Sequence, residues 1–134
     1  MKNAKIKVVI FIFLNGEKIL IEKRIIENFT GEQYLIPGGV VKQLESLEDA
    51  LKREIKEELG IIPLEFTPIP STNIKGLKNQ HLFPFLINKW TGDFPKNVLD
   101  NGNSLDWLEF DEILTTPIVP TRKIIEALKK YLSK

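Results

Sequence analysis

Three glutamates, Glu54, Glu57 and Glu58, stand close together in the stretch ALKREIKEELG. A helix turns by about 100° per residue, so it would carry all three on one side, within about 100° of one another. Like charges at this spacing destabilise a helix by about 0.2–0.5 kcal/mol per pair. A sequence that breaks a local rule in this way often does so at a functional site.

Glu58 is the most unusual of the three acids. In the same helical projection it falls between Leu47 and Leu51, inside the apolar arc, where an unpaired carboxylate is strongly disfavoured. The lysines of this segment point away, and only Arg53 stands beside the acids. A solvent-exposed helix face is the usual explanation for a run of charges, but it accounts poorly for Glu58. Hard divalent cations prefer carboxylate oxygens, so the sequence predicts Mg²⁺ or Mn²⁺ as the compensating charge.

The ends of this helix are well marked. Ser46 followed by Asp49 approximates a capping box, and Gly60 suits the left-handed residue that closes a helix. These signals predict a helix over 47–59, about 20 Å long. Upstream, Pro37-Gly38-Gly39 allows a close approach of the backbone, which beside an acidic helix favours a carbonyl ligand for the metal.

The rest of the chain predicts a mixed sheet covered by helices, an α/β fold. Asn15-Gly16 is a strong hairpin signal between two β-rich segments. Pro120 blocks an earlier start of the last helix, and Thr121 is its expected N-cap. Ahead of Ser104 the chain is expected to be irregular, with a turn at Asp111-Glu112. Strands are expected over 5–14, 17–24, 34–36, 61–67, 81–90 and 105–110.

The composition is that of one globular domain of 134 residues, 43% hydrophobic and 28% charged. A net charge of +1 gives no field that would attract nucleic acid or a membrane. The absence of cysteine excludes disulfides and zinc–thiolate sites and is compatible with the cytoplasm. The N-terminal apolar run lacks a cleavage site, and no segment reaches the ~20 apolar residues of a membrane span.

From Gly39 to Ile61 the chain matches the pattern G-x5-E-x7-R-E-U-x-E-E-x-G-U, where U is aliphatic, without a departure. The chain therefore resembles the Nudix family, and most of all its MutT-type nucleoside triphosphate pyrophosphohydrolases. The segments YLIPGG and LDWLEFDE agree with that type in order as well. The resemblance implies one Nudix domain over residues 1–134, an α/β/α sandwich around a mixed sheet, and a cytoplasmic enzyme.

The resemblance also implies residue roles. Ligands of Mg²⁺ or Mn²⁺ would be the Gly38 carbonyl, Glu57 and Glu58, with Glu54 a further ligand or the general base. Glu45 and Arg53 would orient the acids. Asp106 stands where MutT-type enzymes carry a further metal-linked glutamate; because its side chain is shorter, a surface acid at a strand end is the alternative. The expected substrate-binding residues are Arg24, Leu35, Ile36, Pro37, Gly38 and Asp106, and Lys23 is a further candidate for the polyphosphate.

The implied reaction is hydrolysis of a nucleoside triphosphate to a monophosphate and pyrophosphate. The partner would be this small nucleotide, with no stable nucleic-acid partner and no membrane, and the protein would be a monomer or homodimer. The base-reading asparagine of the MutT type has no counterpart in Pro120-Thr121-Arg122, so a preference for oxidised guanine is not expected. His81, the single histidine, is expected to be packed or at the surface.

Two alternatives stay open. The alternative substrate is ADP-ribose, a dinucleoside polyphosphate or another nucleoside diphosphate-linked compound. The first two are less favoured, because residues 76–79 lack the Pro or Tyr often found in those classes. A non-catalytic module that senses nucleotides is disfavoured by the intact motif.

Overall fold

The computed structural model describes residues 5–70, 74–95 and 103–134, and their strands form two sheets. In the first sheet, β1 and β8 are parallel and the remaining pairs are antiparallel, so the sheet is mixed. Its strands, in spatial order, are β5 (Gly38–Val40), β1 (Ile6–Ile12), β8 (Gln80–Thr91) and β6 (Ile62–Pro68), with the short β7 (Ile74–Lys75) also paired to β8.

The second sheet is antiparallel and is organised around β3 (Lys18–Ile25). Its other strands are β2 (Leu14–Asn15), β4 (Glu32–Leu35) and β9 (Ser104–Glu109). The predicted turn joins β2 to β3, with Gly16 in the left-handed region at φ 65°. The strand expected over 5–14 is divided, because residues 6–12 pair in the first sheet and residues 14–15 in the second. The hairpin is therefore present but short.

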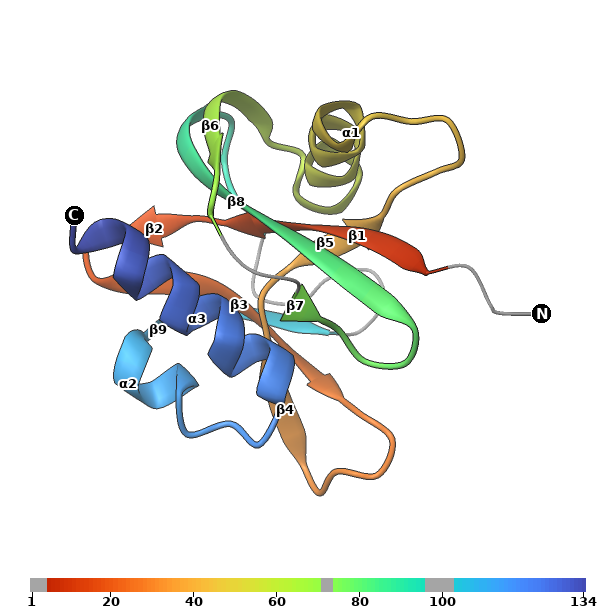
Figure 1. The fold of residues 1–134 in the computed structure, drawn as a ribbon. Coiled ribbons are helices and arrows are strands. Elements are labelled where there is room, and N and C mark those ends of the chain that lie inside the picture. The colour runs from red at the N-terminus through yellow and green to blue at the C-terminus, as the bar shows by residue number, and fades with distance from the viewer. Residues whose placement is uncertain (1–4, 71–73, 96–102) are drawn as a thin grey trace.

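Helices lie on both sides of β1. Val9 and Phe11 belong to the core cluster under α1 (Leu47–Leu59), whereas Ile10 and Ile12 belong to the cluster that includes residues of α3 (Val119–Leu132). Figure 1 shows α1 above the first sheet and α3, with the short α2 (Phe110–Ile113), on the opposite side. This arrangement confirms the expected α/β architecture.

Two predicted segments differ in detail. The expected turn at Asp111-Glu112 forms α2, and the expected loop before residue 79 contains β7. Much of the irregular stretch expected before Ser104 lies outside the described residues.

The predicted start of the last helix is wrong. The helix α3 begins at Val119, with Ile118 as N-cap and Pro120 in its first turn. Proline is tolerated there because the first N–H groups of a helix have no partner within it. Thr121 is instead buried, and its Oγ1 donates a hydrogen bond to the carbonyl oxygen of Tyr34 at 2.9 Å. Thr121 thus attaches α3 to β4.

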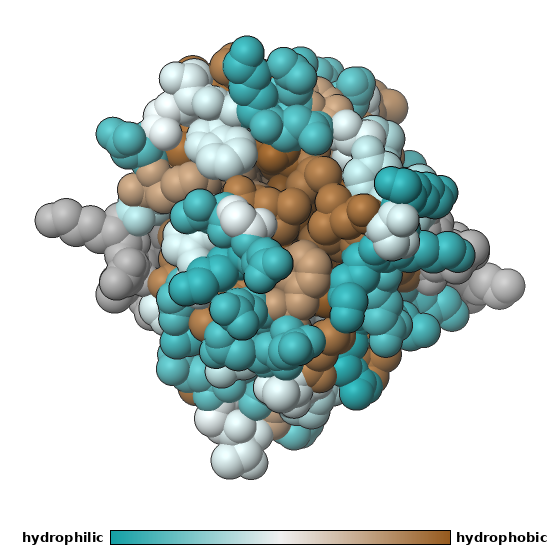
Figure 2. Space-filling model, turned by 90° about the vertical axis from the view of Figure 1, so that its left-hand side faces the viewer, coloured by the Kyte–Doolittle hydropathy of each residue, from teal (hydrophilic) through white to brown (hydrophobic). Residues whose placement is uncertain are grey.

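The surface combines polar and apolar areas. On the face shown in Figure 2, apolar side chains are visible at the bottom of a hollow, and polar side chains surround them. Some exposed apolar area is normal for folded proteins. Within the described ranges, no helix is long and apolar enough to cross a membrane.

We expect Thr121→Val to lower the free energy of unfolding by about 1–3 kcal/mol, because the carbonyl of Tyr34 loses its buried donor while the side-chain volume is kept. Urea unfolding measures this change. Thr121→Ser is the matched control, since it keeps the hydroxyl and gives up one methyl group, worth about 0.8 kcal/mol. A Val variant as stable as the parent would contradict the structural role of this hydrogen bond.

Candidate active site

The helix α1 sets the position of the acids. Its N-cap, Ser46, accepts a hydrogen bond from the Asp49 amide at 3.1 Å, and Gly60 closes the helix at φ 68°. Both signals, and the bounds 47–59, are as predicted from the sequence. The residues that fix the rotation of the helix against β1, β5 and β6 are Ala50, Leu51, Ile55 and Leu59, all buried. The glutamates consequently lie along the edge of this apolar face.

Two glycines in β5 bring the backbone close to this edge. Gly38 and Gly39 pair with Ile10 and Val9 of β1. A side chain on Gly39 would overlap the Glu54 carboxylate, and a Cβ on Gly38 would lie 2.5 Å from the Val9 carbonyl oxygen. The lack of a side chain at Gly39 is therefore what lets β5 and Glu54 meet.

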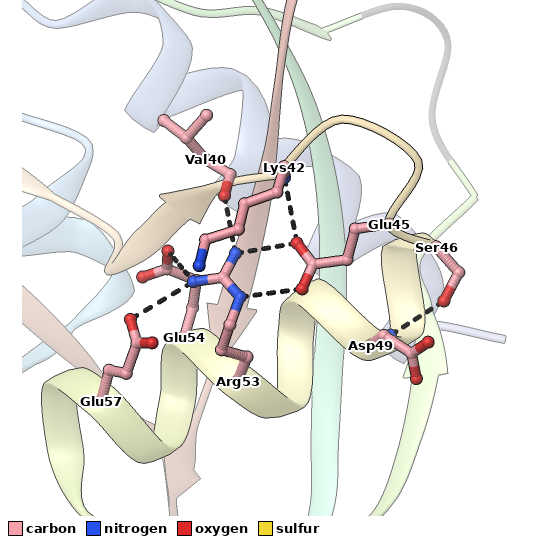
Figure 3. A network of polar contacts seen from close by, with 8 residues as sticks. All are labelled: Val40, Lys42, Glu45, Ser46, Asp49, Arg53, Glu54 and Glu57. Atoms are coloured by element: carbon pink, nitrogen blue, oxygen red, sulfur yellow. Dashed lines mark hydrogen bonds and ion pairs between the residues drawn. The ribbon is translucent and has the colours of Figure 1, made fainter.

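Arg53 is the centre of a polar network (Figure 3). Its Nε and Nη2 donate to the two carboxylate oxygens of Glu45, both at 2.8 Å. Its Nη1 donates to Glu54 at 2.8 Å and to Glu57 at 3.2 Å, and Nη2 also donates to the Val40 carbonyl at 3.0 Å. These hydrogen bonds raise the pKa of Arg53 and lower the pKa of Glu45 to about 2. One guanidinium thus neutralises part of the charge on three carboxylates.

Two other acids stay outside this network. Among the described residues, Oε2 of Glu58 and Oε1 of Glu22 are buried without a hydrogen-bond partner. Burial, followed by the charges of Glu22 and Glu54, raises the pKa of Glu58 to about 7. Burial also raises the pKa of Glu22, although Arg24 and Asn103 act in the opposite direction. The ionised forms of both carboxylates therefore lack sufficient compensation.

A cleft of about 590 Å³ opens beside these groups. Four of the predicted substrate-binding residues line it, namely Arg24, Leu35, Ile36 and Gly38. Gly39 and Glu22 line it as well, and its far wall includes Ile118, Pro120, Thr121 and Ile124. Pro37 is buried outside the lining, and its carbonyl accepts a hydrogen bond from the Phe11 amide at 2.9 Å. Pro37 consequently supports the wall without forming it.

The structure does not bring Asp106 or Lys23 to the cleft. Alternate residues of a strand point to opposite faces, and Lys23 therefore points away from its neighbours Glu22 and Arg24. Asp106 pairs with Ile21 in the register of β3 and β9, on the same face as Lys23. Its carboxylate lies 3.1 Å from Lys23 Nζ and accepts from the Trp107 amide at 2.8 Å. Burial would raise the pKa of Asp106, but these two partners lower it.

His81 lies outside the cleft lining. Its ring stacks on Phe83 with a centroid distance of 4.6 Å.

Glu22 is a cleft residue that was not predicted from the sequence. Its side chain is almost completely buried, with a relative exposure of 3%. A signal was present in the sequence: Ile19, Leu20 and Ile21 predict a strand buried on both faces, and an acid follows directly. The alternation of the strand also places Glu22 on the same face as Arg24.

The donor set fits a divalent cation. Within the described part of the chain, no group of three or more acidic or histidine side chains forms a ready-made metal site. Magnesium does not need one, because it usually binds one or two carboxylates and keeps waters and substrate phosphates as its other ligands. The two buried, unpartnered oxygens of Glu22 and Glu58 are the feature that a cation would complete.

Comparisons with known proteins agree with this chemistry. A family model described as "NUDIX domain" matches residues 4–128. An 8-oxo-dGTP diphosphatase of Buchnera aphidicola (subspecies Schizaphis graminum) is 31% identical over 127 residues, which cover 93% of this chain and 94% of the relative.

Two further proteins are similar to this chain. The crystal structure of a MutT Nudix hydrolase from Burkholderia pseudomallei is similar with a TM-score of 0.74 and 25% identity, covering 93% of this chain and 98% of the other. An ADP-ribose pyrophosphatase of Methanocaldococcus jannaschii is 50% identical over only 46 residues, 34% of this chain and 27% of the relative.

We expect the metal-free protein to lose stability as the pH rises from about 4.5, the ordinary pKa of a glutamate, to about 7, the pKa of Glu58 when folded. In this window the folded state binds more protons than the unfolded state, so the free energy of unfolding falls with pH. The loss from this group is at most about 3 kcal/mol.

Urea unfolding with EDTA between pH 5 and pH 8 measures this loss. In Glu58→Gln the pH dependence should be weaker, and above pH 7 the variant should be at least as stable as the parent. A variant that is several kcal/mol less stable at all pH values would show that Glu58 is a structural hydrogen-bonding residue.

Proposed function

Since the chain belongs to the Nudix family of pyrophosphohydrolases, we propose that it hydrolyses a nucleoside triphosphate to a nucleoside monophosphate and pyrophosphate. One observation carries this proposal: the acidic edge of α1 meets a nucleotide-sized cleft at Gly39, which lines the cleft and contacts Glu54. We also propose that residues 1–134 form a single Nudix domain.

In this proposal the acids of α1 have different roles. The Gly38 carbonyl, Glu57 and Glu58 hold the cation, Mg²⁺ or Mn²⁺, and Glu54 is a further ligand or the base that accepts the proton of the attacking water. A divalent cation at this place neutralises charge on the phosphates and lowers the pKa of the attacking water. Arg53 keeps Glu54 and Glu57 oriented through its hydrogen bonds of 2.8 and 3.2 Å.

Arg24 binds the nucleotide in this proposal. Its side chain is 40% exposed and lines the cleft, so its guanidinium is available to a phosphate. Leu35 and Ile36 line the same cleft and supply an apolar wall for the base. Glu22 lies 3.6 Å from the guanidinium of Arg24 and limits the positions that it can take.

The residues of α3 that line the cleft support a base preference different from that named for the relative from Buchnera aphidicola. Pro120 has no N–H, and the hydroxyl of Thr121 already donates to the Tyr34 carbonyl. Arg122, the third residue of this segment, does not line the cleft, and its guanidinium carries donors only. None of the three residues therefore replaces an asparagine that reads a base with both a donor and an acceptor. We propose that oxidised guanine is not the preferred base, although the relative is named for it.

We expect hydrolysis of at least one nucleoside triphosphate to stop in EDTA and to return with Mg²⁺ or Mn²⁺. The measurement is the release of pyrophosphate or phosphate from a panel of ordinary and oxidised nucleoside triphosphates, ADP-ribose and dinucleoside polyphosphates. Glu57→Gln should lower kcat at least about a hundredfold, because the cation supplies several kcal/mol to the transition state. Glu48→Gln, an exposed acid in the first turn of α1, is the control and should keep full activity. Full activity of the parent after rigorous chelation would refute metal dependence.

We expect Arg24→Ala to raise KM for the best nucleotide about tenfold or more, because a charge-assisted hydrogen bond is worth about 1.5–3 kcal/mol. The control is Lys89→Ala, which removes an exposed cation whose partner is Glu65, outside the cleft. Steady-state kinetics of both variants measure the difference. An unchanged KM in Arg24→Ala would remove this residue from the nucleotide site.

A further inference from the structure

Glu22 is a buried acid that lies outside the family motif of residues 39–61. It lies in β3, far in sequence from the acidic helix, and lines the cleft with a relative exposure of 3%. Among the residues that the structure describes, its Oε1 has no hydrogen-bond partner. A buried carboxylate in this state is costly, and a structural role alone gives no reason for it.

Arg24 does not provide a hydrogen bond to the Glu22 carboxylate. The distance from Arg24 Nη1 to Glu22 Oε2 is 3.6 Å, which is an ion pair without a hydrogen bond. The side chain of Asn103 also hydrogen-bonds to this carboxylate. Within the described ranges, Oε1 nevertheless has no hydrogen-bond partner.

The fold directs Glu22 toward the acids of α1. On β3, the residue two positions earlier on the same face is Leu20, which packs in one cluster with Leu51 and Ile55 of α1. Glu58 comes about one helical turn after Ile55, on the same helix. Both acids carry an oxygen without a partner in the described part of the chain. The unpartnered oxygens thus belong to two elements, β3 and α1, whose side chains pack in one cluster.

We propose that Glu22 is an additional ligand of the divalent cation, which it holds together with Glu58 between β3 and α1. The inference rests on the proposed function, because it concerns the same cation. A carboxylate pair of this kind suits Mg²⁺ or Mn²⁺, which take a few carboxylates and complete their shell with water and phosphate. Since Glu22 also pairs with Arg24, it connects the cation to the residue that binds the nucleotide.

The test measures binding of Mn²⁺ alone, without nucleotide, by the electron paramagnetic resonance of the free ion. Glu22→Gln keeps the shape of the side chain and removes its charge, and should raise the Kd for Mn²⁺ at least tenfold. The stabilisation of the fold by Mg²⁺ in thermal melts should fall in parallel. The control is Glu27→Gln, an exposed acid that also lines the cleft and should bind Mn²⁺ as the parent does.

The outcomes separate this inference from the proposed function. An unchanged Mn²⁺ affinity in Glu22→Gln, with Glu58→Gln impaired and the parent active, overturns the role of Glu22 alone. A parent that neither binds Mn²⁺ nor hydrolyses a nucleotide overturns both proposals. The stability of Glu22→Gln in EDTA should be no lower than that of the parent. A clear loss there would show that Glu22 is a structural residue and overturn the inference.

Discussion

The ion network of Arg53 is the interaction on which the acidic helix depends. Its guanidinium donates to Glu45, Glu54 and Glu57, and its side chain is only 20% exposed. Removing one partner of a largely buried ion pair leaves an uncompensated charge, which is far more costly than a broken surface pair. Without Arg53, the three carboxylates would repel one another at the edge of the core. The network therefore reduces this repulsion, and through Val40 it holds the carboxylates beside β5.

Three elements that are distant in sequence each contribute something that the others lack. The helix α1 supplies carboxylates on a rigid support, because its apolar face is buried and its first turn is capped. Strand β5 supplies a backbone without side chains, so that Glu54 can approach it at Gly39. Strand β3 supplies Glu22 and Arg24, one charge of each sign, on the wall of the cleft. Reactions of phosphates need negative and positive side chains close together. The acids hold a cation, and a cationic side chain holds the phosphates.

Features that are set by residues close in sequence were predicted, whereas features that are set by contacts with distant residues were not. The cap at Ser46, the end at Gly60 and the burial of one helix face follow from residues within a few turns of one another, and all were correct. Glu22, Lys23 and Asp106 were different, because their roles depend on which face of β3 and β9 each side chain occupies. That face is set by strand pairing across more than eighty residues. The compensation of the acids was predicted in part. The sequence placed Arg53 beside the acids and predicted a divalent cation as the main compensating charge. In the structure Arg53 donates to Glu54 and Glu57, and also to Glu45, eight residues away.

The acids near the cleft fall into two groups: those that Arg53 partly neutralises, and the buried acids outside its network. Arg53 hydrogen-bonds to the outer carboxylates, whereas in the described part of the chain Glu22 and Glu58 keep buried oxygens without partners. The burial that raises the pKa of Glu58 to about 7 also strengthens any charge interaction made there, because the local dielectric is low. A phosphate that enters this field alone meets repulsion, and a cation that enters alone lacks several ligands. In the proposed function, each therefore improves the binding of the other, and by linkage the effect is reciprocal. The buried acids that lower the stability of the metal-free protein are, in this proposal, what makes the site select a cation and a nucleotide together.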